Sequence, residues 1–335
     1  MEFDKLQIIR PLQEIFDLAL KKIKKNRSII KKKIDKLGYI SKLKKLNDYK
    51  IKTINGDFKK YLKNIVESFP NIDQLHLFYR ELIILELDYN KLKKSLGAVK
   101  WSFETIEKIT FEKLMQLGRK KNREELNLIF KSYLGRINSI IKQTKKEFEY
   151  IEKCRFHMKK FPAVKTKLFT ICISGFPNVG KSTLLYKITK SKPEIKNYAF
   201  TTKKINAGII DSIYGKIQFV DTPGTLIRPN KANKIEIHAN LALEYLANQV
   251  LFIFDLTESS YSIEDQFKLL EKNEEYSKNI TAYTSKQDLI ENQTIEDFKK
   301  LYKSKKIKYK LITEFEDLKK FIQSNLKKWV LDNQN

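Results

Sequence analysis

The spacing of apolar residues changes character once along the chain, at Pro162. Before this point apolar side chains recur every three or four residues, which is the period of a helix that buries one face. After it, short runs rich in β-branched residues alternate with helical patterns. The chain of 335 residues is long enough for two separate cores, so we predict two domains, residues 1–163 and residues 164–335.

The first domain is expected to be a helical bundle. Its helical spacing begins at Pro11, which is tolerated there because the first turn leaves that N–H unpaired, and continues to about Phe161. Turn-forming residues at a few sites should divide the region into about four to six packed helices. The last helix is predicted from near Asn122 to Lys160. The expected turn sites are Gly38, Asn55-Gly56, Phe69-Pro70-Asn71 and Gly97.

The second domain is expected to be α/β. Six short segments have the composition of strands, and helical patterns follow the first and the last four of them. Tyr214-Gly215 closes a hairpin between the second and third segments, so we predict a mostly parallel six-stranded sheet with one antiparallel strand and helices on both faces. The expected strands are Leu168–Ser174, Ile205–Ile210, Lys216–Asp221, Val250–Asp255, Ile280–Thr284 and Ile307–Ile312.

The sequence GFPNVGKST follows the first expected strand and opens the first helix of this domain. It fits GxxxxGK[ST], a pattern in which glycines let backbone amides curl around a phosphate chain at a helix N-terminus. In this pattern Lys181 reaches the β- and γ-phosphates, and the Ser182 hydroxyl binds Mg²⁺. The residues expected to contact a nucleotide here are Gly175, Phe176, Pro177, Asn178, Val179, Gly180, Lys181, Ser182 and Thr183.

Two further loops follow strands of the same expected sheet. In DTPG, after the third strand, Asp221 can hold Mg²⁺ through water and the Gly224 amide can turn toward a γ-phosphate. In SKQD, after the fifth strand, the Asp288 carboxylate can accept from two guanine donors while the Lys286 stem covers the base plane. Adenine lacks this donor pair, so we expect guanine. The residues expected at the nucleotide are Asp221, Thr222, Pro223, Gly224, Ser285, Lys286 and Asp288.

The charge of the chain is strongly positive and unevenly distributed. Lys and Arg number 67 against 40 acidic residues, a net charge of +27. Residues 1–167 hold 41 basic and 20 acidic side chains and residues 168–335 hold 26 and 20, so the balances are +21 and +6. Such an excess indicates a polyanionic partner, such as nucleic acid, for the N-terminal half. The alternative is a Lys-rich composition without a binding surface, since only eight of the 67 are Arg.

The cysteines and the lengths of the apolar runs indicate where in the cell the protein is located. Cys154 and Cys172 match no metal-ligand or paired-cysteine spacing. No apolar run approaches the roughly 20 residues that span a bilayer, and the N-terminus is charged from its second residue. We therefore expect a cytoplasmic protein with reduced thiols and no membrane partner.

These motifs together resemble the Nog family, nucleolar-type G proteins of the Obg branch of P-loop GTPases. The most characteristic segment is DLTESSYSIEDQ, residues 255–266, which resembles that family's D-x-[ST]-E…Y-x-[IL]-E-x-Q pattern. The resemblance implies a member of the short, archaeal type. The resemblance implies a basic helical bundle followed by a Ras-like P-loop GTPase domain. Further segments that carry it are GFPNVGKSTL at 175–184, NYAFTT at 197–202, DTPGTLIRP at 221–229, FPNIDQLHLFYREL at 69–82 and LGRINSIIKQ at 134–143.

The resemblance implies a GTPase that acts in assembly of the large ribosomal subunit. Its partners would be rRNA or pre-ribosomal particles, and it would be a monomer off the ribosome. Its cofactors would be GTP or GDP with Mg²⁺, which Thr202 joins in the triphosphate state beside Phe200 and Thr201. Asn178 would help to place a K⁺ ion near the phosphates. The residues that the resemblance makes catalytic are Lys181, Thr202, Asp221 and Gly224.

Several positions depart from the family pattern. Ser285 replaces the Asn of NKxD, so we expect a side-chain tie between the base loop and the phosphate loop to be missing. Thr313-Glu314 stands in place of an SA pair that closes over guanine, which leaves Thr313 as the expected contact there. The segment at residues 230–233 is one residue shorter than in the family pattern and lacks the Arg and the acidic pair that are usual there. Thr225 replaces a water-orienting Gln of Ras-like enzymes, so we expect slow intrinsic hydrolysis.

Two other functions fit parts of the sequence. A P-loop ATPase or small-molecule kinase needs no guanine-reading Asp and usually has an Arg-rich lid, whereas Arg228 is the only Arg after Phe161. A basic RNA-binding protein with a decayed nucleotide site fits Ser285 and Thr313. Glu258 is a candidate carboxylate facing the switch loops, with an ordinary surface acid as the alternative.

Overall fold

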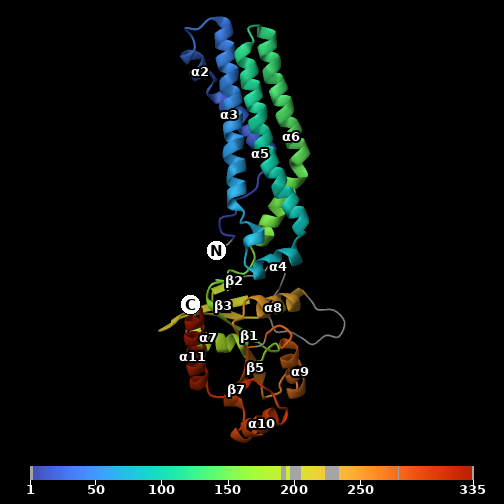
Figure 1. The fold of residues 1–335 in the computed structure, drawn as a ribbon, viewed down its shortest axis with the longest axis vertical. Coiled ribbons are helices and arrows are strands. Elements are labelled where there is room, and N and C mark those ends of the chain that lie inside the picture. Colours follow the sequence, from blue (N-terminus) through green and yellow to red (C-terminus); the bar gives the residue numbers. More distant parts are fainter. Residues whose placement is uncertain (1–2, 190–193, 197–204, 223–233, 278, 334–335) are drawn as a thin grey trace. The chain divides into compact units, whose positions relative to one another are not determined.

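The computed structural model describes residues 3–189, 194–196, 205–222, 234–277 and 279–333. Over these residues the chain forms two compact units. The helical unit comprises the residues up to 74 and residues 83–159, and the sheet unit comprises residues 75–82 and the residues from 160 onward (Figure 1).

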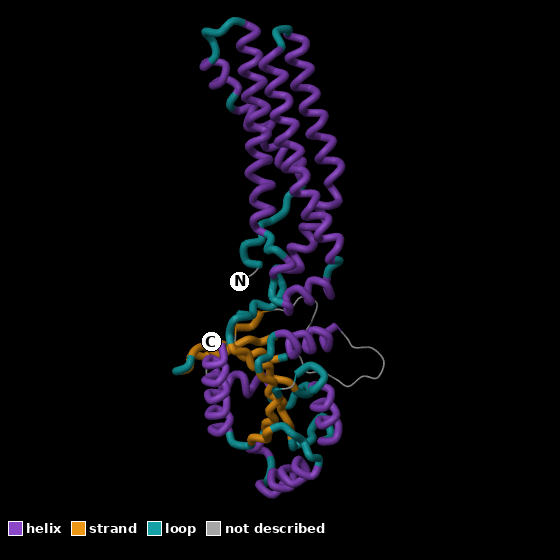
Figure 2. The backbone as a smooth tube through the Cα atoms, in the orientation of Figure 1, coloured by secondary structure: helices purple, strands orange, loops and turns teal. Residues whose placement is uncertain are grey.

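Three long helices, α3, α5 and α6, run side by side and form the body of the helical unit (Figure 2). Helix α5 packs against both of the others, and α1 packs against α3. The apolar stripe of α3 is fully buried from Ile51 to Ile65, which fits a helix that turns one face to a core. The helices are α1 (Leu12–Lys25), α2 (Arg27–Lys33), α3 (Tyr39–Ser68), α4 (Leu77–Glu86), α5 (Tyr89–Arg119) and α6 (Arg123–Met158), with a 3-10 turn η1 at Ile72–Gln74.

Two of the expected turn sites are confirmed and two are wrong. Gly38 precedes α3, and Phe69-Pro70-Asn71 follows it. In contrast, Asn55-Gly56 and Gly97 lie inside α3 and α5. A glycine in a helix costs only about 1 kcal/mol relative to alanine, which burial of the adjacent apolar stripe outweighs.

Asn55 shows the same effect through hydrogen bonds. Its side-chain amide donates to Glu107 Oε1 at 2.8 Å and its oxygen accepts from Thr110 Oγ1 at 3.2 Å, so a residue typical of turns serves here to join α3 to α5. Asn122 caps the last helix by accepting from the Glu124 N–H, so the predicted start of that helix is confirmed.

The sheet unit confirms the expected fold class. All six expected strands are present, and the described residues add a three-residue edge strand, β2. The order is β2-β3-β4-β1-β5-β6-β7, with β2–β3 and β3–β4 antiparallel and the other pairs parallel. The strands are β1 (Phe169–Ser174), β2 (Glu194–Lys196), β3 (Ile205–Ser212), β4 (Gly215–Asp221), β5 (Gln249–Asp255), β6 (Ile280–Ser285) and β7 (Lys310–Ile312).

Helices cover both faces of this sheet, with α7 and α11 on one face and α8 and α9 on the other (Figure 1). The helices are α7 (Lys181–Thr189), α8 (Lys234–Tyr245), α9 (Ile263–Asn273), α10 (Asn292–Ser304) and α11 (Phe315–Asn333). Among the described helices, none is long and apolar enough to cross a membrane.

A short piece of the N-terminal half belongs to the sheet unit. The Tyr79 ring is buried, and its hydroxyl accepts from the Val164 N–H at 3.1 Å and lies within 3.0 Å of the carbonyls of Pro162 and Val164. These bonds are consistent with the grouping of residues 75–82, which include the first part of α4, with the sheet unit, while the last part of α4 belongs to the helical unit.

The parallel register brings four loops to one edge of the sheet. Strand β1 lies between β4 and β5, and β6 follows β5. Their carboxyl ends, at Ser174, Asp221, Asp255 and Ser285, therefore all open onto the same edge, where ligands of open α/β sheets bind.

Candidate nucleotide-binding site

The loop between β1 and α7 has a backbone that only certain residues adopt. Gly175 has φ +144°, and a Cβ there would lie 2.9 Å from the Ile253 carbonyl oxygen. Gly180 has φ +92°, and Asn178 lies in the left-handed region at φ +66°. Both glycines of GxxxxGK are thus required by the turn that places this loop over the sheet edge.

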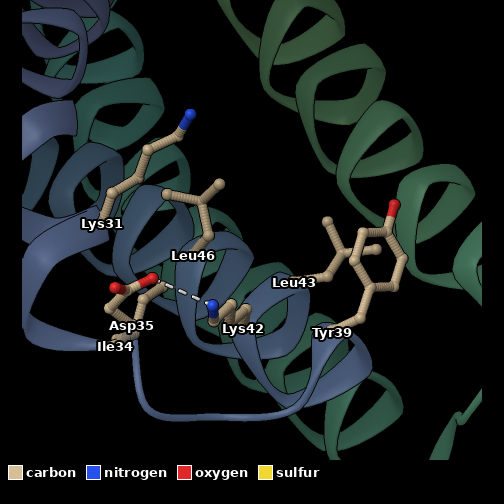
Figure 3. A pocket seen from close by; sticks show the side chains of 7 residues that line it. All are labelled: Lys31, Ile34, Asp35, Tyr39, Lys42, Leu43 and Leu46. Carbon is tan, nitrogen blue, oxygen red and sulfur yellow. Dashed lines mark hydrogen bonds and ion pairs between the residues drawn. The ribbon is translucent and has the colours of Figure 1, made fainter.

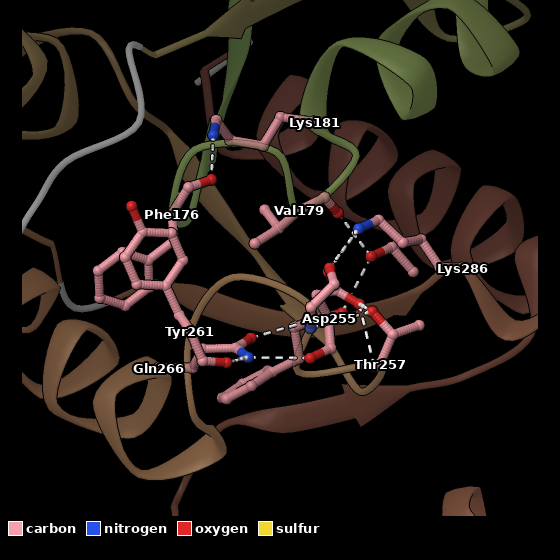
Figure 4. Close-up of polar contacts among 11 residues, drawn as sticks. Phe176, Val179, Lys181, Asp255, Thr257, Tyr261, Gln266 and Lys286 are labelled. Atoms are coloured by element: carbon pink, nitrogen blue, oxygen red, sulfur yellow. Dashed lines mark hydrogen bonds and ion pairs between the residues drawn. The ribbon is translucent and has the colours of Figure 1, made fainter. Parts of the chain in front are cut away.

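Lys181 is the first residue of α7 and is 7% exposed. Its ammonium donates to the carbonyl of Phe176 at 2.6 Å (Figure 4) and also to that of Gly175 at 3.1 Å. The loop therefore curls around its own lysine, and the positive charge lies inside the ring of backbone that a phosphate chain would enter.

Ser182 and Asp221 come together from different parts of the chain. The Ser182 hydroxyl donates to Asp221 Oδ2 at 2.5 Å, at the point where α7 begins and β4 ends. Thr222 anchors the end of β4, because its N–H and its hydroxyl both donate to the Ile173 carbonyl, at 3.1 and 2.8 Å. A hydroxyl and a carboxylate are oxygen ligands of the kind that Mg²⁺ prefers, so Ser182 and Asp221 together fit the expected ion.

Ser285 corrects one expectation drawn from the sequence. Its buried hydroxyl lies 2.6 Å from the carbonyl of Val179 in the phosphate loop and 3.0 Å from that of Phe254 at the end of β5. The tie between the base loop and the phosphate loop, expected to be missing, is therefore made by a hydroxyl in place of an amide.

The base loop is held by a residue that no sequence motif singles out. Gln287 lies between Lys286 and Asp288, and its amide donates to the carbonyl and hydroxyl of Thr284, at 3.0 and 2.7 Å, and to the Thr313 carbonyl. Gln287 thus joins the loop after β6 to the loop after β7. Asp288 lies in the 3-10 turn η2 (Gln287–Leu289) and is exposed.

Lys286 joins the base loop to the end of β5 by a charged contact. Its ammonium lies 2.5 Å from Asp255 Oδ2 (Figure 4), and Asp255 Oδ1 accepts from the N–H and the hydroxyl of Thr257. Burial raises the pKa of Asp255, but the bonds from Lys286 and Thr257 outweigh it and hold that pKa below its ordinary value. The carboxylate is therefore charged at neutral pH.

Glu258 has a structural role at the start of α9. Its carboxylate accepts from the Ile263 N–H at 3.1 Å, so it caps that helix, while its own backbone is left-handed at φ +49°. The side chain is exposed, as in the alternative of a surface acid, and the switch loops lie outside the described residues, so its position relative to them stays a prediction.

Several expected site residues lie outside the described residues. They are Phe200, Thr201, Thr202, Pro223, Gly224, Thr225 and residues 230–233.

Comparison with known proteins establishes the family. A family model described as the NOG1 N-terminal helical domain matches residues 3–165, and one described as 50S ribosome-binding GTPase matches residues 170–290. The uncharacterized protein MJ1408 of Methanocaldococcus jannaschii is 35% identical over 296 residues, which cover 88% of this chain and 83% of that protein. The chain belongs to the Nog1 family.

Other similar proteins carry the name nucleolar GTP-binding protein 1. Nucleolar GTP-binding protein 1 of Drosophila melanogaster is 32% identical over 80% of this chain but only 41% of its own length. A crystal structure from Plasmodium falciparum, assigned by the same name, is 24% identical, covers 52% of this chain and 93% of its own, and has a TM-score of 0.41. The chain spans about half the length of the eukaryotic relatives it matches.

Membership of the Nog1 family settles two expectations. The matched domain is that of a GTPase, so GTP binding and hydrolysis are the chemistry of this domain type. The expected cytoplasmic location is contradicted, because the relatives from Drosophila melanogaster, Kluyveromyces lactis and Saccharomyces cerevisiae are named nucleolar.

Proposed function

We propose that the chain is a nucleotide-gated assembly factor for the large ribosomal subunit. In this function the basic residues 1–163 bind rRNA or pre-ribosomal particles, and residues 164–335 bind GTP and hydrolyse it slowly. The observation that carries the proposal is the meeting of Lys181, Asp221 and the base loop at one sheet edge. The description of the matched domain as a 50S ribosome-binding GTPase supports the ribosomal partner.

Each residue of the phosphate site has a task that fits its contacts. Lys181 would exchange its two carbonyl partners for phosphate oxygens, which accept stronger, charge-assisted bonds. Ser182 and Asp221 would hold Mg²⁺, directly and through water, and the ion would neutralise charge that develops on the phosphates. Thr202 and Gly224 would complete the triphosphate state.

Guanine selectivity is expected to depend on Asp288. Replacing Asp288 with Asn exchanges an acceptor for a donor at the position that faces the guanine N–H groups, so GTP affinity should fall by about 1–3 kcal/mol, roughly 5- to 150-fold. The measurement is a titration of fluorescent GDP, GTP and ATP into the wild-type and Asp288→Asn chains. Equal affinity of the wild type for GTP and ATP would contradict the proposed function.

A matched control removes another carboxylate of the same region. Asp297 lies on the exposed face of α10 and pairs with Lys300 at 3.1 Å, outside the four loops at the sheet edge. Asp297→Asn should leave GDP affinity unchanged, because surface ion pairs contribute little.

Hydrolysis is expected to be slow and to rise with K⁺. Asn178 is exposed in the phosphate loop with a left-handed backbone, where its side-chain oxygen can serve a monovalent cation, and Thr225 cannot orient water as Gln does. The measurement is the rate of phosphate release in KCl and in NaCl at equal ionic strength, for wild type and Asn178→Ala. Identical rates in both salts would leave a ribosomal activator as the source of acceleration.

A further inference from the structure

The segment Asp255–Gln266, which joins β5 to α9, lies against both nucleotide loops. At its start, Asp255 is 3% exposed and pairs with Lys286 of the base loop at 2.5 Å. Further along, the Tyr261 ring stacks on that of Phe176 in the phosphate loop, with centroids 4.1 Å apart and planes inclined by 16° (Figure 4). One short segment thus touches both loops.

Gln266 holds the backbone of this segment through hydrogen bonds from its buried side chain. The side chain is 1% exposed, and its amide oxygen accepts from the Asp255 N–H at 2.8 Å. Its amide nitrogen donates to the carbonyls of Asp255, at 2.9 Å, and Tyr261, at 3.1 Å. With Thr257 occupying Asp255 Oδ1, the other carboxylate oxygen is directed at Lys286.

Lys286 gains a defined conformation from this contact. Its backbone is left-handed at φ +52°, an uncommon conformation for a residue other than glycine. A lysine with a solvated ammonium samples many rotamers, whereas one that is anchored by a buried carboxylate presents its four-carbon stem in one arrangement. An apolar stem held still is a suitable surface for the face of an aromatic base.

We propose that Asp255 is a positioning residue for guanine, which holds Lys286 so that its stem lies ready against the base. The inference rests on the proposed function and deepens it, since it assigns to the β5–α9 segment a share in base recognition. The phosphate loop is reached separately, through Tyr261, so loss of Asp255 should weaken contact with the base and leave contact with the phosphates intact.

The test compares a whole nucleotide with a chain of phosphates that lacks the base. We expect Asp255→Asn in the full chain to raise the dissociation rate of fluorescent GDP about tenfold, the effect of losing one charge-assisted contact. The affinity for inorganic tripolyphosphate, measured by competition with the same fluorescent GDP, should change by less than about twofold. Retained tripolyphosphate binding also shows that the variant is folded.

Two further variants make the result specific. In a Lys286→Met background, which keeps the stem and removes the ammonium, Asp255→Asn should have less than about twofold additional effect, because the two residues act as one unit. Asp265→Asn removes a carboxylate of the same segment that bonds Ser262 and Lys268, and should leave GDP dissociation unchanged.

The outcomes separate the inference from the function beneath it. A full tenfold effect of Asp255→Asn in the Lys286→Met background, or an equal loss of tripolyphosphate, would overturn the positioning role while guanine binding by the wild type still stood. Wild-type binding with no preference for guanine over adenine would overturn both.

Discussion

Replacement of Lys181 by Met is expected to lower the affinity for GTP and GDP by about 3–5 kcal/mol, roughly 150- to 5,000-fold. The ammonium is enclosed by the phosphate loop and already donates to two of its carbonyls, so a phosphate chain that enters the loop meets a desolvated charge. Met keeps most of the volume of the stem, so the loss reports the charge and its hydrogen bonds. The measurement is a titration of fluorescent GDP followed by single-turnover GTP hydrolysis.

The control for this variant lies on the same helix. Lys187 is exposed near the end of α7, where its ammonium lies 4.4 Å from the centre of the Phe315 ring. Lys187→Met makes the same change of charge away from the phosphate loop and should leave affinity within about twofold of wild type. Wild-type turnover by Lys181→Met would place the chemistry at another site.

The sequence predicted the parts of the site that depend on neighbours along the chain. The phosphate loop follows a strand, opens a helix and needs glycine where φ is positive, and all three features are local, so Gly175 and Gly180 could be identified from spacing alone. The mostly parallel sheet with helices on both faces could be predicted from the alternation of strands and helices, whereas the order of the strands could not.

The contacts that join the loops could not be predicted in this way. The residue type of Ser285 predicts a defect because it differs from Asn, yet its hydroxyl reaches Val179, which is 106 positions away in sequence. Gln287 stands at the variable position of SKQD, and Gln266 is marked only as the last residue of the pattern in residues 255–266, since an amide is informative only once its partners are known. The resemblance in residues 255–266 was the one available sign, and it marked the segment without saying what its side chains hold.

In the helical unit, the sequence predicted turns that the structure does not have. Gly and Asn predict turns because of their backbone preferences, but Gly97 and Asn55 lie within long helices. Here side-chain contacts between α3 and α5 outweigh preferences of about 1 kcal/mol or less per residue.

The second large effect is expected from salt. If the basic half binds rRNA through phosphates, affinity should fall about 10³-fold or more between roughly 50 and 200 mM KCl, the loss for six or more neutralised phosphates. This expectation rests on the net charge, which is +21 in residues 1–167 and +6 in the rest of the chain. The chain should be kept whole, because residues 75–82 belong to the sheet unit and a fragment ending at 163 would lose the bonds of Tyr79 to Val164.

Helix α2 is a suitable place to test which lysines cause the salt dependence of rRNA binding. None of its residues is buried, and its last turn carries Lys31, Lys32 and Lys33. Beside it, a pocket between α2 and α3 combines an apolar wall with basic side chains (Figure 3). There Lys42 is paired with Asp35 at 3.0 Å, whereas the Lys31 ammonium points away from that pair. The pocket is lined by Lys31, Ile34, Asp35, Tyr39, Lys42, Leu43 and Leu46.

Changing the three lysines of α2 to Gln should flatten the log–log salt slope of rRNA binding by about 2–3, since each phosphate contact contributes roughly 0.7–0.9. The same change at Lys299, Lys300 and Lys303 on α10 removes equal charge from the sheet unit and should leave the slope within about 0.5 of wild type. Binding would be measured by fluorescence anisotropy with a labelled rRNA fragment across a KCl series. A flat wild-type response, or equal losses from both triple variants, would mean that the excess of lysine is a matter of composition and that the helices present no phosphate-binding surface.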